Sequence, residues 1–466
     1  MNYSKLLHKC GKRINYKFAR LGDLIQNLPM LIKFHDVVPY LMSRPNRAVV
    51  DTFIKDMAGM HVNKRENFQK RYSEIHSRYE KIIFGQYFMR HVGEMCLTYY
   101  LWRIENKGQE KLLYVMAPVL LDDSYDKIPN NYFFNKIQED IEIIQQDNYE
   151  FWCWMLRHHR KEVEFTDRYS WDEMRKRDMA YINVSKDFFQ VCLEPKDQTF
   201  LKQMEIGDEF ICIYNRDSAY YRAMGITGNA VSTRPSERDS SVSDYNLLSK
   251  EFKARGISSV RMGYQVAEKA ETEDIIDYAS KYRTERLDFY LISKCKFFVV
   301  SNSGIMVIAK LFTTPLVVVN AVVLSFGGDI VEPMTPQKDL ILLKKFWYTK
   351  QDRYLSLDEI LYMEGKYKSY EVFDAYRSLG IVFQSNSQEE LLDIANEMLK
   401  RLEGKQVYTE EDERLQERYR SILERNVKSS GNHYYNGRYG AKFLRQNPWF
   451  LEDVDEELSI KNIELK

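Results

Sequence analysis

Basic and polar side chains stand where several apolar strands of the sequence end. In chain order they are Arg216 and Asp217 after EFICIYN, Arg261 and Gly263 in SVRMG, Ser301, Asn302, Ser303 and Gly304 after FFVV, and Asn320 at the end of LVVVN. Because the carboxyl ends of parallel strands share one edge of a sheet, we expect these residues to meet. A guanidinium pairs phosphate oxygens through two parallel bonds, so the pattern predicts a diphosphate pocket that needs no metal ion. Taken singly, each arginine could equally form a surface ion pair.

The turn Ser301–Gly304 is a second reason to expect an anion site. A strand that opens through Ser-Asn-Ser-Gly into a helix would present free amides and the positive end of the helix dipole. Gly304 would let a phosphate approach the backbone closely. The alternative is an ordinary strand-to-helix connection. Asp288, on the preceding helix, is expected to bind a ribose hydroxyl or to cap the turn, or else to be a solvated acid.

His91 and Glu94 lie at a second strand end, nearer the N-terminus. The run KIIFGQ predicts a strand, the following segment predicts a helix that ends before Gly108, and KLLYVMAP predicts another strand. Strand, helix and strand at this length form a parallel unit, and its turns lie at the ligand-binding edge. His91 is therefore a candidate general base, with Glu94 as a neighbouring acid. The alternative for His91 is a hydrogen-bonded structural histidine.

Other chemistries lack their motifs. The sequence contains no G-x-x-x-x-G-K-[ST], no H-E-x-x-H and no G-x-S-x-G. The histidines do not cluster with carboxylates at metal-ligand spacing. Asp453-Val454-Asp455 has the D-x-D form of a metal-binding motif, but it lies in an acidic tail rather than after a strand. We therefore expect no metal site and no tightly bound cofactor.

Composition sets outer bounds on the class of protein. The 466 residues carry 68 Lys and Arg against 68 Asp and Glu, which gives no reason to expect a nucleic-acid partner. Scattered cysteines and the lack of a secretory signal or long apolar run predict reduced thiols and a cytoplasmic protein. Residues 1–21 are basic with interleaved apolar side chains, which suits peripheral contact with the inner face of the cytoplasmic membrane or, alternatively, a solvated helix.

The remaining pattern places these residues on an α/β scaffold. Residues 207–320 alternate strands and helices, which predicts a second doubly wound unit with a parallel sheet. Residues 24–79 look helical, and 139–159 read as one helix. Residues 387–404 form an amphipathic pattern in which Ser387 is the expected N-cap, and a helix is expected over 409–425.

Several of these stretches resemble a family of bacterial surface-carbohydrate glycosyltransferases of GT-B type, distantly similar to fucosyltransferases and heptosyltransferases. The matching stretches are YNRDSAYY, SVSDYNLLSKEF, SVRMGYQVAE, the segment from IIDYASKY through SNSGIMVIAKLF, and PLVVVN. Looser matches are RHVGE and FLRQNPWFL, and the resemblance covers roughly 80–450. RHVGE departs from the family because no glycine directly precedes His91.

The resemblance implies two Rossmann-like domains facing across a cleft, with extra helices at both ends of the chain. The expected divisions are a helical extension over 1–79, an acceptor domain over 80–205, a nucleotide-sugar domain over 206–385, and helices and tail over 386–466. It also implies transfer of a sugar from a nucleotide-sugar co-substrate to a glycan, lipid-linked or protein acceptor. The alternatives are a nucleotide-sugar epimerase of the same fold and a non-catalytic nucleotide-sugar-binding scaffold.

Overall fold

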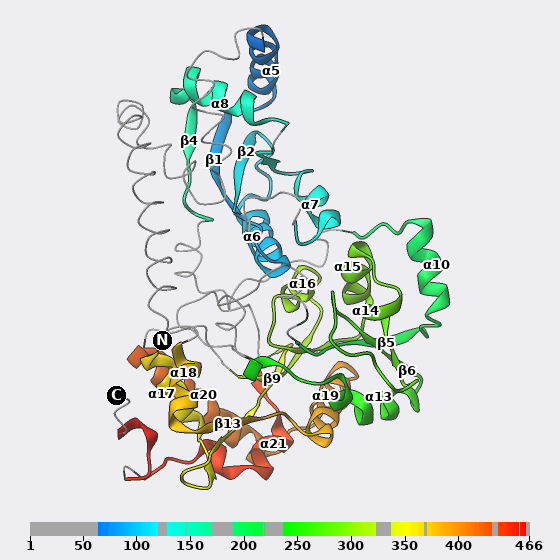
Figure 1. Cartoon of the computed structure of the whole chain (residues 1–466), viewed down its shortest axis with the longest axis vertical. Coiled ribbons are helices and arrows are strands. Elements are labelled where there is room, and N and C mark those ends of the chain that lie inside the picture. Colours follow the sequence, from blue (N-terminus) through cyan, green and yellow to red (C-terminus); the bar gives the residue numbers. More distant parts are fainter. Residues whose placement is uncertain are drawn as a thin grey trace, which may run out of the picture. The chain divides into compact units, whose positions relative to one another are not determined.

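The computed structural model describes residues 64–119, 128–145, 147–169, 190–217, 219, 236–322, 337–367, 371–430, 437–455 and 457–462. The basic segment 1–21 and most of the expected helical extension lie outside these residues. The chain divides into two compact units (Figure 1). Unit 1 is drawn from Met1–Arg90, Gly108–Ile128 and Ile137–Ser170, and unit 2 from His91–Lys107, Pro129–Lys136 and Trp171–Lys466.

Unit 1 is built on a four-stranded parallel sheet of order β3-β2-β1-β4. The strands are β1 (Lys81–Phe88), β2 (Leu112–Val119), β3 (Glu142–Ile143) and β4 (Val163–Phe165). Its helices are α5 (Arg65–Arg78), α8 (Tyr149–His158) and the short η4 (Arg160–Glu162). Phe84 and Val115 on the sheet and Trp152 on α8 belong to one buried apolar cluster. The expected strands β1 and β2 are thus confirmed, parallel and in register.

The single helix expected over 139–159 is wrong in its first half. That half contains the strand β3, and the helix α8 begins only at Tyr149. Asn148 makes the break, since its side-chain oxygen accepts from the Gln145 amide at 2.7 Å and its side-chain nitrogen donates to the Ile143 carbonyl at 2.9 Å. Two adjacent β-branched isoleucines favour the strand that precedes this turn.

Unit 2 is built on a seven-stranded parallel sheet of order β14-β10-β9-β8-β5-β6-β7. Its strands are β5 (Glu209–Tyr214), β6 (Ile257–Arg261), β7 (Ile275–Ile276), β8 (Phe298–Ser301), β9 (Leu316–Ala321), β10 (Leu340–Leu343) and β14 (Arg438–Tyr439). The central strands β8 and β9 are buried along their whole length, as a sheet covered on both faces requires. The expected α/β class with two Rossmann-like units is confirmed.

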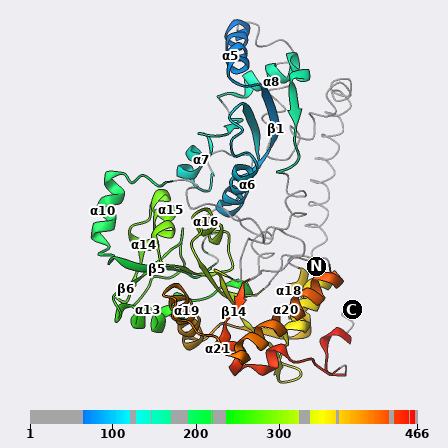
Figure 2. The ribbon, with the colours of Figure 1, turned by 180° about the vertical axis from the view of Figure 1, so that it is seen from behind.

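Helices cover both faces of this sheet. On one face α13 (Asn246–Lys253) packs against α19 (Gln388–Leu402), and on the other lie α14 (Tyr278–Lys281), α15 (Glu285–Lys294) and α16 (Met306–Leu311) (Figures 1 and 2). Helix α6 (Val92–Glu105) also belongs to unit 2 and packs on α16. The predicted N-cap of α19 is confirmed: Ser387 and Glu390 form a capping box.

The last part of unit 2 adds a small antiparallel sheet and the C-terminal helices. The sheet has the order β12-β11-β13. The remaining elements of the unit are α7 (Asn131–Ile137, partly in unit 1), α10 (Pro195–Gln203), η5 (Ser236–Arg238), η6 (Val242–Tyr245), β11 (Lys345–Tyr348), β12 (Arg353–Tyr354), α17 (Leu357–Lys366), α18 (Glu371–Leu379), β13 (Ile381–Gln384), α20 (Glu410–Ser430), α21 (Ala441–Gln446), η7 (Pro448–Leu451) and η8 (Ile460–Asn462). The helix expected over 409–425 is therefore present as α20.

Candidate functional site

The strand order of unit 2 defines where a ligand would bind. The first strand, β5, has β6 and β7 on one side and β8, β9 and β10 on the other, so the chain reverses its direction of winding between β5 and β8. In open α/β sheets ligands bind outside the carboxyl ends of the strands at this switch point. The residues that leave β5 and β8 are Asn215–Asp217 and Asn302–Gly304, which are the stretches singled out in the sequence.

At the end of β5 the side chain of Arg216 is buried and ion-paired. Its guanidinium donates to the carboxylate of Asp239, and its side chain is only 5% exposed against 24% for Asp239. Burial raises the pKa of the Asp239 carboxyl, although Arg216, Lys344 and Arg238 act in the opposite direction. Arg216 therefore lies at the switch point as predicted, and the Asp239 carboxylate already accepts a hydrogen bond from its Nη1.

At the end of β8, hydrogen bonds between hydroxyl and carbonyl groups connect the turn to β5. Ser301 Oγ donates to the Tyr214 carbonyl at 3.3 Å and lies 3.1 Å from Ser240 Oγ. The Arg238 guanidinium donates to the backbone oxygen and to Oδ1 of Asn302, at 2.8 and 2.9 Å. The structure thus brings Ser301 and Asn302 together with Arg216, through a segment that the sequence pattern did not single out.

The turn itself differs from the anion cradle expected of it. Helix α16 has six residues, and the amides of Met306 and Val307 already donate to the carbonyls of Ser303 and Gly304 at 3.2 Å each. The amides of Met306 and Val307 are therefore occupied by bonds within the turn. The Ser303 hydroxyl is different: its oxygen is buried and has no hydrogen-bond partner within the described ranges. Ser303 is the member of this turn best suited to a ligand.

Gly304 faces protein rather than open space. A Cβ atom built on Gly93, in the first turn of α6, would lie 2.7 Å from the Cα and from the carbonyl oxygen of Gly304. One built on Gly304 would lie 3.3 Å from the Cα and the nitrogen of Gly93. The two glycines allow backbone to pack on backbone, which replaces the expected reason for glycine at 304, an approaching phosphate.

His91 and Glu94 come to this site through the same contact. His91 is the N-cap residue of α6, its carbonyl accepts from the Met95 amide at 3.1 Å, and Glu94 lies in the first helical turn. Both side chains are partly exposed. Since residues 91–107 cluster with unit 2, both candidates belong to the unit that carries the switch point.

Arg261 does not take the position expected of a phosphate ligand. Its side chain is completely buried, Nε donates to Asn215 Oδ1 at 3.2 Å, and Nη1 donates to the Glu268 carbonyl at 2.7 Å. Its ion-pair partner is Asp277, at 3.5 Å. Gly263 follows with φ of 151°, in the region that favours glycine. Arg261 therefore fixes the side chain of Asn215 through a hydrogen bond.

The three remaining candidates have structural partners of their own. Asp217 accepts from the amides of Ala219 and Ala267, at 2.8 and 2.9 Å. Asp288 accepts from the Tyr278 hydroxyl at 2.8 Å and pairs with Arg283 at 2.7 Å, while burial raises the pKa of its carboxyl. Asn320, with φ of 51°, exchanges amide hydrogen bonds of 2.7 Å with Asn386. Asp288 is thus bound in a buried network with Tyr278 and Arg283.

Lys344 and Asp239 were missed in the sequence. Lys344 follows β10 directly, is 5% exposed, and donates from Nζ to the Asp239 backbone carbonyl at 2.6 Å. Burial lowers the pKa of its amine to about 8, against the opposing influence of Asp239 and Asp244. The available signal was a lysine at the end of the apolar run LILL, the same kind of signal that identified Arg216. Asp239 lies in a polar loop and gave no such signal.

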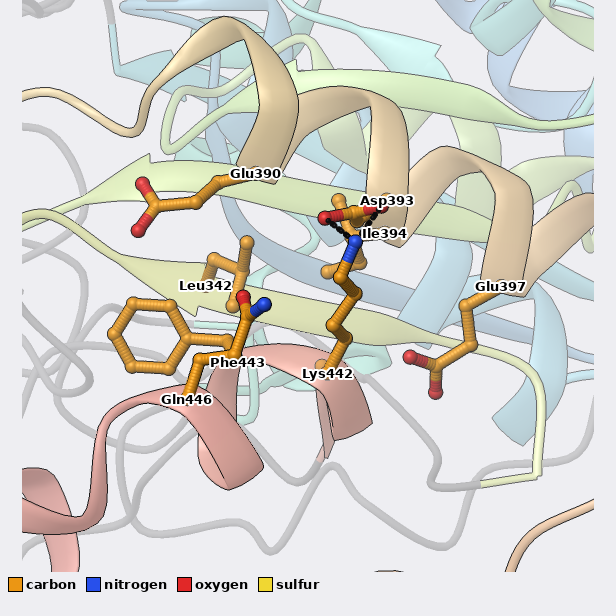
Figure 3. A pocket seen from close by; sticks show the side chains of 9 residues that line it. Leu342, Glu390, Asp393, Ile394, Glu397, Lys442, Phe443 and Gln446 are labelled. Atoms are coloured by element: carbon orange, nitrogen blue, oxygen red, sulfur yellow. Dashed lines mark hydrogen bonds and ion pairs between the residues drawn. The ribbon is translucent and has the colours of Figure 1, made fainter.

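A hollow between α19 and α21 is a structural junction rather than a substrate site. Figure 3 shows Lys442 reaching Asp393, with Glu390 and Glu397 on either side along α19. The acids have partners: Glu390 pairs with Lys345 at 3.1 Å, and Glu397 accepts from the Ala441 amide at 2.9 Å. The hollow therefore holds two helices together.

Metal ligands and membrane spans were also sought in the described part of the chain. Among these residues no group of three or more His, Cys, Asp or Glu side chains could hold a metal ion. No described helix combines the length and apolar character needed to cross a membrane. Independence from metal remains a prediction.

Unit 2 is thus an α/β unit with the strand order of a nucleotide-binding Rossmann sheet. No protein-family model and no curated protein matches the chain. Among solved structures it is similar to a glycosyl transferase family 9 protein from Veillonella parvula, at 16% identity over 69% of this chain and 98% of that one, with a TM-score of 0.39. It is also similar to the ADP-heptose lipopolysaccharide heptosyltransferase II of E. coli, at 14% identity, 69% and 99% coverage and a TM-score of 0.36.

A further similar structure is the iron-containing dodecameric glycosyltransferase TibC of enterotoxigenic E. coli, at 10% identity, 52% and 58% coverage and a TM-score of 0.28. All three of these solved structures are glycosyltransferases, the class of enzyme that the sequence motifs resemble. Identities and TM-scores this low carry no conclusion about activity, which has to come from the residues of the site.

Proposed function

We propose that the protein is a glycosyltransferase that moves a sugar from a nucleotide-sugar donor to a glycan, lipid-linked or protein acceptor in bacterial surface polysaccharide or glycoconjugate synthesis. One observation carries the proposal: the Rossmann strand order of unit 2 has its switch point between β5 and β8, where Arg216 and Ser303 lie. A buried arginine after one strand and, after the neighbouring strand, a buried hydroxyl with no partner among the described residues suit a phosphate group better than an apolar ligand.

The donor would bind with its phosphates at Arg216 and at the turn Ser301–Gly304. As the bond to the anomeric carbon breaks, negative charge grows on the leaving nucleotide, and a preorganised guanidinium and hydroxyl stabilise that charge. The buried partners of the site, including Arg261 and Asp288, would act by fixing the strand ends rather than by touching the donor. Asp217, Gly263 and Asn320 belong to the same supporting group.

His91 is our proposed general base, with Glu94 as the alternative. The contact between Gly93 and Gly304 supports this assignment, because it holds the first turn of α6 against the donor turn. A base in that place would take the proton of the acceptor hydroxyl as the sugar is transferred. We further propose that the nucleotide sugar is the sole co-substrate, that no metal is tightly bound, and that the protein acts in the cytoplasm at the inner membrane face.

Incubation with candidate nucleotide sugars tests the proposal. The wild-type protein is mixed with UDP-, GDP-, CMP- and TDP-linked sugars, and nucleotide release and sugar products are followed by chromatography. Release of nucleotide with transfer or hydrolysis of the sugar supports the proposal, whereas isomerisation of an intact donor would make the protein an epimerase. Arg216→Met should abolish release, while Arg414→Met is the matched control, since Arg414 is 73% exposed on α20. Binding of the donor without turnover would indicate that the protein is a non-catalytic nucleotide-sugar-binding scaffold.

A further inference from the structure

The segment 238–240 crosses the ends of β5 and β8 at the switch point. The Ser240 amide donates to the Arg216 carbonyl at 3.0 Å, and the Asn215 side chain donates to the Ser240 carbonyl at 3.0 Å. Arg238, in the same segment, is bound to Asn302. The backbone of the segment is therefore fixed by its own hydrogen bonds, and none of these involves the Asp239 carboxylate.

Asp239 contacts two of the cations at the switch point, Arg216 and Lys344. Its side chain pairs with Arg216, its backbone carbonyl accepts from Lys344 Nζ at 2.6 Å, and Arg238 also lies close enough to influence it. The Arg216 side chain is 5% exposed and that of Asp239 is 24% exposed. The carboxylate thus lies on the more accessible side of the pair, where an incoming anion would meet it first.

Burial makes this carboxylate a poor permanent partner for the cations. Desolvation raises the pKa of Asp239, and the nearby carboxylate of Asp217 adds to the rise. Burial likewise lowers the pKa of the Lys344 ammonium, and Arg216 adds to the fall, although Asp239 and Asp244 act in the opposite direction. A ligand with more negative charge than one carboxylate would satisfy both cations better.

We propose that Arg216 and Lys344 form a two-cation site for the diphosphate of the donor, and that Asp239 is the exchangeable counter-ion of this site. This inference rests on the proposed function and adds to it a second binding residue and a competing anion. A carboxylate and a phosphate use the same donors of a guanidinium, so the two compete for Nη1 of Arg216. Because the backbone of the segment is held independently, Asp239 can leave Nη1 by rotation of its side chain alone.

Inorganic pyrophosphate is the probe, because it contains the proposed binding group without a base or a sugar. Its affinity is measured by titration calorimetry for the wild-type protein, Asp239→Asn and Lys344→Met. We expect Asp239→Asn to bind at least about fivefold more tightly, since the competing charge is gone while the side-chain shape is kept. Lys344→Met should bind roughly tenfold or more weakly, since a charge-assisted bond is lost. The matched control, Asp274→Asn, removes an acid that pairs with Lys253 at the surface and should change nothing.

The outcomes separate this inference from the proposed function. Equal or weaker binding by Asp239→Asn, in a protein whose melting temperature is unchanged, would make Asp239 a positioning residue and overturn the exchange. Wild-type affinity in Lys344→Met would remove Lys344 from the site. If sugar transfer is observed but pyrophosphate does not bind, only the inference fails. If neither transfer nor pyrophosphate binding is observed, the proposed function fails and the inference fails with it.

Discussion

Arg216 and Arg261 end neighbouring strands of one sheet, and their surroundings differ sharply. Arg261 is fully buried and held by Asn215, the Glu268 carbonyl and Asp277. Arg216 pairs with the carboxylate of Asp239, which is partly exposed to solvent. An arginine at a strand end is therefore no guide by itself to ligand binding. What distinguishes the two is the exposure of the acidic partner, whose side chain is 3% exposed for Asp277 and 24% exposed for Asp239.

The largest effect should come from Arg261→Met. The change leaves the Asp277 carboxylate buried without a cation, and breaking a buried pair in this way typically costs about 3–5 kcal/mol. Urea unfolding followed by circular dichroism measures the loss. The equivalent change at Arg216 should cost clearly less stability, because its partner Asp239 can reach water. Equal losses at the two positions would remove the distinction between them.

Binding should show the reverse order. Arg216→Met should weaken nucleoside diphosphate binding on the order of 10–100-fold, the range expected when a hydrogen bond to a charged group is lost. Titration calorimetry with the diphosphate of the preferred donor gives the value. Arg414→Met provides the baseline for removing an arginine elsewhere in unit 2. Unchanged affinity in the Arg216 variant would move the donor site away from β5.

Gly93→Ala tests the contact between Gly93 and Gly304, which holds the start of α6, and with it His91, against the turn that follows β8. The new methyl group would lie 2.7 Å from Gly304 backbone atoms, which cannot rotate away, so we expect a loss of about 1–3 kcal/mol. Turnover should fall as well, because the turn and the start of α6 are forced apart. Gly207→Ala is the matched control, since its methyl group would meet nothing nearer than 3.8 Å. Full stability and turnover in Gly93→Ala would show that the contact is not needed.

The smallest effect is a pH dependence that arises from Lys344. Its pKa of about 8 in the folded protein lies below the ordinary 10.5, so the unfolded chain binds more protons between these values. Lys344 therefore lowers stability in full below pH 8, and this cost disappears as the pH rises toward 10.5. Nucleoside diphosphate affinity should fall above pH 8 by at most about tenfold per pH unit, as the ammonium loses its proton. In Lys344→Met the affinity should not change with pH in this range. If the pH dependence persists in this variant, a group other than Lys344 is responsible for it.

The sequence predicted the strand ends well because each is marked locally, by an apolar run that stops at a polar residue. Arg216, Ser301 and Asn302 were found in this way, and they meet in the structure. The partners could not be found by the same means. Asp239 is 23 residues from Arg216 in a polar loop, and only the folded chain brings its carboxylate to the guanidinium.

The errors have physical causes of the same kind. The run 139–159 was expected to be one helix, but its isoleucines favour the strand β3, and Asn148 interrupts the run through side-chain bonds that composition does not reveal. Gly304 was correctly marked as a position of close approach, but the approaching group is the backbone of Gly93, more than 200 residues earlier in the chain. Local patterns predict which residues have an unusual structural role, and long-range packing decides which groups they contact.

The contact between the two glycines also has a mechanical consequence. Side-chain contacts absorb small displacements by changing rotamer, but two peptide backbones in direct contact have no such freedom. A ligand that shifts the turn at Ser303 and Gly304 by a few tenths of an ångström must therefore push the first turn of α6 with it. If the donor binds at this turn as proposed, the position of His91 depends directly on whether the turn is occupied.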